Sequence, residues 1–124
     1  MRLKLLAAAA IVLPSIASAQ SMNAESFYKR SAALIAKGPL ALFSRGEINV
    51  LMTEAGNAGK AARAQRLAAL AAGKPPRACP PEQSKMGSDE FMKRLGAIPA
   101  AERARINMTE AMTRITIARF PCPR

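Results

Sequence analysis

The sequence predicts an all-α fold, a small bundle of about four helices closed by one disulfide. Apolar residues recur at three- and four-residue intervals between segments that end in glycine or proline, and no useful run alternates with a period of two. Alanine supplies 27 of the 124 residues, which favours helix but fills little core volume. A chain of this length forms one compact domain at most.

Residues 1–19 have the organisation of a secretory signal peptide. Arg2 and Lys4 precede an apolar run from Leu5 to Leu13, and a triplet of small residues ends the segment. The run is shorter than the roughly 20 residues that a membrane-spanning helix needs, so we expect no transmembrane segment. The remainder, residues 20–124, is expected to form a single helical domain in the bacterial periplasm, with full secretion as the alternative.

Cys79 and Cys122 are the two cysteines of the chain. An oxidising compartment favours a disulfide between them. Closing a loop of this length stabilises the fold by about 4 kcal/mol through the denatured-state entropy that it removes. We expect a structural bond, because the two cysteines do not form the CxxC pair that is typical of redox proteins.

The first helix is predicted over residues 24–37. Asn23 is the expected N-cap, Glu25 lies in the first turn, and Gly38-Pro39 ends the helix. Four residues at helical spacing form its predicted inward face: Phe27, Ser31, Leu34 and Ile35.

A second helix is predicted after the apolar link of residues 40–43. Ser44 and Glu47 have the spacing of a capping box. Gly56 and Gly59 weaken the helix by about 1 kcal/mol each, so we expect a bend or a tight helix crossing there. Residues 60–72 favour helix but pack weakly, because only Leu67 and Leu70 are large and apolar. The predicted inward stripe comprises Ile48, Leu51, Met52 and Ala55.

The last third of the chain begins with a stiff, non-helical connection in which Gly73 and four prolines surround Cys79. Ser88 is predicted to cap a short third helix that Gly96 and Pro99 end. A fourth helix is predicted from Asn107, whose spacing to Glu110 again suits a capping box. Its predicted buried stripe comprises Ala111, Met112, Ile115 and Ala118.

Positive charge is the strongest compositional signal, with a formal net charge of +11. Removal of the signal peptide would lower it to +9. We expect Lys60, Arg63 and Arg66 to bind a partner, either an acidic protein surface or an anionic envelope polymer. Nucleic acid is not expected, because export and a single tyrosine disfavour a base-stacking surface. The alternative is a solvated helix face that keeps the protein in solution.

Catalysis, cofactors and metal ions are not expected. The chain has no histidine, which removes the usual acid-base group near neutral pH, and a lysine base is the remaining route. Asp89 and Glu90 are adjacent, so their side chains diverge by about 100° on a helix. Methionines 86, 92, 108 and 112 are soft-metal ligands by type, but Met92 and Met112 lie on the predicted apolar stripes, which indicates core packing.

Residues 79–124 carry a recognisable order of motifs: Cys79-Pro80-Pro81, then residues 88–92, then residues 98–103, and finally Phe120-Pro121-Cys122-Pro123. This order resembles the Rap/Tai group of type VI secretion amidase-immunity proteins. The resemblance implies a small exported helical protein that binds a peptidoglycan amidase and blocks its active cleft, with Cys79 and Cys122 as the expected disulfide. It leaves the inhibitory surface unassigned, because the front half departs from the family pattern. The alternative function is a basic envelope-binding or stress-type module without a toxin partner.

Overall fold

Four α-helices of ten residues or more and two short helices make up most of residues 21–124, the part of the chain that the computed structural model describes. The predicted signal peptide, residues 1–19, lies outside the described residues. No strand occurs in residues 21–124, and the predicted all-α bundle closed by a disulfide is confirmed. The helices are α1 (Ala24–Ala36), η1 (Gly38–Ser44), α2 (Arg45–Ala71), α3 (Ser88–Ala97), α4 (Ala100–Arg103) and α5 (Met108–Arg119).

The N-termini of α1 and α5 lie side by side. Asn23 Oδ1 accepts a hydrogen bond from the Ser26 amide at 3.0 Å, and Asn107 Oδ1 accepts one from the Glu110 amide at 2.8 Å, so both predicted N-caps are confirmed. The two asparagines also pair in a short antiparallel bridge. Its backbone bonds join Ala24 to the Ile106 carbonyl and Met108 to the Met22 carbonyl. Helices distant in sequence therefore begin at a common point.

The capping box predicted for α2 is wrong, although the helix begins at Arg45 as expected. Ser44 makes no side-chain cap hydrogen bond. Glu47 instead accepts two hydrogen bonds from Arg30 of α1, at 2.6 and 2.7 Å. A bidentate bond to a guanidinium is stronger than one to a neutral amide, so the tertiary partner prevails over the local one. The cap predicted at Ser88 is also wrong, because Ser88 lies inside α3 and Gly87 occupies the N-cap position.

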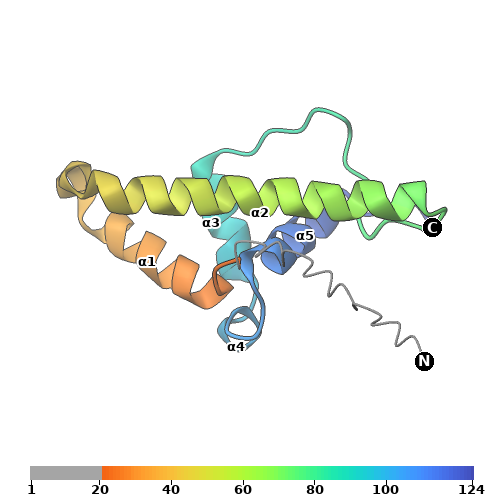
Figure 1. Cartoon of the computed structure of the whole chain (residues 1–124). Coiled ribbons are helices and arrows are strands. Elements are labelled where there is room, and N and C mark those ends of the chain that lie inside the picture. Colours follow the sequence, from red (N-terminus) through yellow and green to blue (C-terminus); the bar gives the residue numbers. More distant parts are fainter. Residues whose placement is uncertain (1–20) are drawn as a thin grey trace, which may run out of the picture.

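Helix α2 runs without interruption for 27 residues (Figure 1). The bend or tight crossing predicted at Gly56 and Gly59 is therefore wrong. A Cβ built at either glycine meets nothing within 4 Å. The propensity cost of these glycines is offset by tertiary packing, since α5 lies along much of α2.

A Schellman motif ends α2. Gly73 has a φ of 69°, in the left-handed region that glycine adopts without steric cost. Its amide donates to the Leu70 carbonyl, and the Lys74 amide donates to the Ala69 carbonyl. The chain then leaves the helix as the proline-rich connection of residues 74–87, which arches back toward α3 (Figure 1).

The buried apolar residues form one cluster between the helices. Its largest fully buried members are Leu95, Met108 and Ile115. Ala118 was predicted to be buried but is exposed, while Thr109 and Thr113 are buried. The Thr113 hydroxyl donates to the Thr109 carbonyl at 3.0 Å, so a polar residue enters the core without losing a hydrogen bond.

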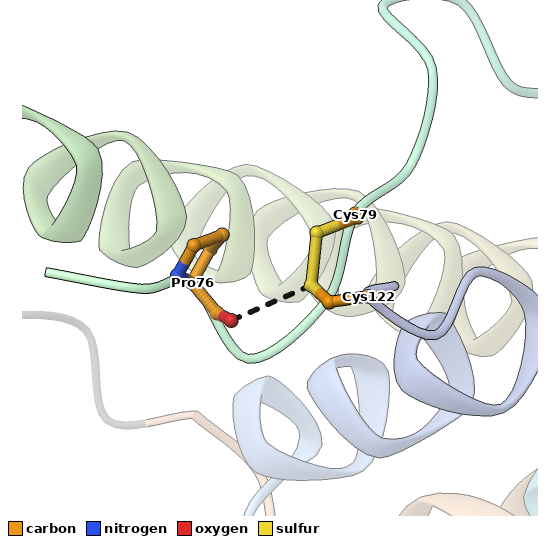
Figure 2. Close-up of a disulfide and its surroundings, with 3 residues drawn as sticks. All are labelled: Pro76, Cys79 and Cys122. Atoms are coloured by element: carbon orange, nitrogen blue, oxygen red, sulfur yellow. Dashed lines mark hydrogen bonds between the residues drawn. A yellow bond between two sulfur atoms is a disulfide. The ribbon is translucent and has the colours of Figure 1, made fainter. Parts of the chain in front are cut away.

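The disulfide joins the proline-rich connection to the end of the chain. Cys79 and Cys122 are bonded, with their Cα atoms 4.9 Å apart, and the Cys79 amide donates to the Phe120 carbonyl at 2.9 Å. Cys122 Sγ also lies 3.5 Å from the Pro76 carbonyl oxygen (Figure 2). A disulfide sulfur has no proton to donate, so we treat this approach as a packing contact. The connection is thus anchored to the segment that follows α5.

Candidate functional site

An open apolar groove of about 410 Å³ lies between α1, α2 and the start of α3. Ile35 and Met52 line it and are 65% and 68% exposed. Both were predicted to pack inward, and that prediction is wrong. The hairpin of α1 and α2 presents a wider apolar face than the ten-residue α3 covers. The full lining comprises Phe27, Ser31, Leu34, Ile35, Ile48, Leu51, Met52, Ala55, Met86, Gly87, Ser88, Phe91, Met92 and Met112.

The floor of the apolar groove is rigid and its walls are adaptable. Phe27 and Leu51 are buried beneath it, and the Phe27 ring meets Phe91 edge to face with centroids 5.9 Å apart. Four methionines line the groove: Met52, Met86, Met92 and Met112. Unbranched thioether side chains repack around a bound surface at little cost. Met92 and Met112, which were predicted to pack in the core, pack against the core cluster and also line the groove, whereas Met108 is fully buried.

The tip of the α1–α2 hairpin adds a second exposed apolar surface. Leu40, Leu42 and Phe43 of η1 are 65%, 67% and 89% exposed. Residues 40–43 were interpreted from the sequence as an apolar link between helices. In the sequence, the signal for an exposed apolar surface is a run of four consecutive apolar residues that does not continue the helical periodicity of its neighbours.

Most acidic side chains are held by arginines of the same chain. The Arg30 guanidinium hydrogen bond lowers the pKa of the Glu47 carboxyl from its usual value. Arg77 donates two hydrogen bonds to Glu110, of 2.7 and 2.9 Å, and lowers the pKa of that carboxyl in the same way. Three further acidic side chains, Glu25, Glu90 and Glu102, are paired with Arg103, Arg94 and Arg114.

The three residues predicted to bind a partner lie in the second half of α2. Lys60 and Arg63 are exposed and Arg66 is partly exposed. None of the three takes part in an ion pair within residues 21–124. Arg63 and Arg66 line a common hollow of about 260 Å³, which Lys60 does not. Arg77, in contrast, forms an ion pair with Glu110.

The hollow beside Arg63 and Arg66 is closed by the disulfide-anchored connection. Pro80, Pro81 and Glu82 form one side of it, and Arg119 of α5 forms another. The Arg119 guanidinium lies over the Phe120 ring, 4.8 Å from its centroid, and donates to the Lys85 carbonyl. Met86 and Met112 line both this hollow and the apolar groove, so the two surfaces adjoin.

Comparisons with protein-family models, curated proteins and solved structures found no significant match to this chain. The resemblance of residues 79–124 therefore stays a prediction. Within residues 21–124, no three His, Cys, Asp or Glu side chains gather closely enough to hold a metal ion. In the same residues, no helix combines the length and the apolar character needed to cross a bilayer.

Proposed function

We propose that this chain is an exported periplasmic binding protein that recognises an acidic protein of the envelope and inhibits it by occlusion. The resemblance to amidase-immunity proteins names a peptidoglycan amidase as the partner to test first. The observation that carries the proposal is the apolar groove, in which Ile35 and Met52 are each about two-thirds exposed beside a buried floor.

An open groove of this kind supports a protein partner. Burial of apolar surface contributes roughly 25 cal/mol per Å², and two large side chains at the rim offer that gain to a projecting apolar residue of the partner. The four methionines allow the walls to adjust to its shape. Phe43, at the tip of the hairpin, extends the apolar contact beyond the groove.

The charges near the groove support an acidic partner. Lys37 follows the end of α1, Arg45 begins α2, and Lys85 precedes the lining residue Met86; all three are exposed. None of these cations is in an ion pair within the described part of the chain. Glu82 and Asp89 are exposed acidic residues within four positions of Lys85, and neither is in an ion pair within the described residues. Complementary charge accelerates association and fixes the orientation of the complex.

The disulfide supports binding through rigidity. It anchors residue 79, and the segment that follows supplies Met86 and Gly87 to the groove. A surface that is already ordered loses less entropy when it binds. The oxidising compartment that maintains this bond is also the one in which a peptidoglycan amidase acts.

The test is coexpression of the exported chain with a periplasmic amidase encoded beside it. We expect the chain to suppress lysis and to form a complex on gel filtration. Met52→Glu should abolish both, because it places a negative charge in the groove. Val50→Glu is the matched control: Val50 is 48% exposed on the same helix, about 160° around its circumference from Met52.

Undiminished lysis without a complex would contradict the proposed inhibition. Protection that survives Met52→Glu but is lost with Val50→Glu would move the binding surface to the opposite face of α2. Circular dichroism of both variants checks that the added charge leaves the helices intact.

A further inference from the structure

The second half of α2 carries an exposed mixture of cations and leucines that the fold leaves uncovered. Leu67 and Leu70 are 49% and 53% exposed and lie about one turn apart on the helix. At 100° per residue, the two leucines and the neighbouring cations fall within about 120° of the helix circumference. We call this surface the basic stripe: Lys60, Arg63, Arg66, Leu67 and Leu70.

The basic stripe lacks compensating acid. The chain has no acidic residue between Glu54 and Glu82. Arg63 and Arg66 are three residues apart on one helix, where like charges repel. Glu82 lines the same hollow, yet no ion pair joins it to either arginine. An anion bound between the two guanidinium groups would relieve this repulsion.

We propose that the basic stripe binds the phosphate groups of anionic phospholipids at a membrane surface. Arg63 and Arg66 present planar guanidinium groups, which bind phosphate oxygens with two hydrogen bonds at a time. Leu67 and Leu70 line a second hollow, of about 630 Å³, together with the two arginines. In the proposed complex they enter the boundary between headgroups and acyl chains, as the apolar residues of interfacial helices do.

The shape of the stripe favours a membrane over an acidic protein. From Lys60 to Leu70 it extends about 15 Å along a straight helix and is flanked beyond the helix end by Lys74. A row of cations and two leucines along a straight helix fits an extended anionic surface, to which each cation contributes separately. The apolar groove uses residues 48–55 of α2 instead, so the lipid site does not depend on the proposed inhibition.

The test is cosedimentation of the oxidised mature chain with vesicles. We expect binding to vesicles of equal parts phosphatidylcholine and phosphatidylglycerol, none to phosphatidylcholine alone, and a steep loss with added salt. Arg63→Gln/Arg66→Gln should lower the partition coefficient roughly 30-fold, since each cation near an anionic surface contributes about fivefold. The charge-matched control, Lys29→Gln/Lys93→Gln, alters exposed cations on α1 and α3 and should have a much smaller effect.

A second variant tests the leucines directly. The chain has no tryptophan, so Leu70→Trp provides a single fluorescent probe whose emission should shift to the blue with phosphatidylglycerol vesicles. No shift, or equal losses in the arginine and lysine variants, would overturn the proposal. Binding of pyrophosphate or polyglutamate that depends on Arg63 and Arg66, without binding to vesicles, would also overturn it, in favour of a free phosphate compound or an acidic protein.

Discussion

Arg103 Nε lies 2.6 Å from Glu25 Oε2 and joins α4 to α1 across 78 positions of the sequence. The Arg103 side chain is 7% exposed and that of Glu25 is 16% exposed. The same guanidinium donates to the Gly96 and Ile98 carbonyls and lies 4.1 Å from the centroid of the Tyr28 ring. One buried cation therefore connects α1, the end of α3 and α4.

Arg103→Met should lower the free energy of unfolding by about 3 kcal/mol, because it leaves the mostly buried Glu25 carboxylate without its partner. Urea denaturation measures this change. Arg94→Met is the matched control, since Arg94 pairs with Glu90 on the surface of α3 and such pairs contribute about 1 kcal/mol at most. Equal unfolding midpoints for the two variants would contradict this role of Arg103.

Cys79→Ala/Cys122→Ala should lower the free energy of unfolding by about 4 kcal/mol. The two cysteines are 43 positions apart in the sequence, and without the bond the unfolded chain regains the conformational entropy that closing this loop removes. A reducing agent should destabilise the wild type by a similar amount and leave the double variant unchanged. Thiol titration of protein isolated from the envelope checks the bond in the compartment that we expect for this chain. Free thiols there would contradict both the disulfide and the expected export.

Acid should weaken the contact between the proline-rich connection and α5. The pKa of Glu110 is lowered mainly by its hydrogen bond to Arg77 and further by Arg114. The unfolded chain then binds more protons than the folded one, so this stabilisation is present above the unfolded value of about 4.5 and is lost as the pH falls through the lower folded pKa.

Glu110→Gln should therefore reduce the difference in melting temperature between neutral and acidic solution, and Arg77→Gln should do the same by removing the largest cause of the pKa shift. Thermal unfolding followed by circular dichroism over a pH series measures the effect. An unchanged pH dependence in both variants would show that the pair contributes nothing to acid sensitivity.

Gly56→Ala and Gly59→Ala should each raise the free energy of unfolding by about 0.5–1 kcal/mol, because alanine favours helix and the added Cβ meets nothing within 4 Å. Gly96→Ala should not stabilise, although Gly96 is also helical. Its Cβ would lie 3.1 Å from Tyr28 Oη and 3.3 Å from Tyr28 Cε2, and that ring lies against Arg103. Denaturation of the three variants side by side tests the comparison, and equal gains would contradict it.

The candidate site was less predictable from the sequence than the helices were. Lys60, Arg63 and Arg66 were identified from charge alone, but only the fold shows that Arg63 and Arg66 share a hollow with Arg119 and that Arg77 is held by Glu110. The apolar groove was missed because Ile35 and Met52 fit an inward stripe. Whether such a stripe is covered depends on the length and position of α3, which helical periodicity does not encode.

The sequence by itself determined the helical class, the caps at Asn23 and Asn107, and the pairing of the two cysteines. The helices and caps depend on residues that are close in sequence, and two cysteines allow only one pairing. Tertiary structure decided that Glu47 pairs with Arg30 instead of capping α2, that Arg103 is buried, and that Ile35 remains exposed. The physical reason is that an ion pair or a covered apolar face needs a partner from another segment, and that partner is selected only when the helices pack.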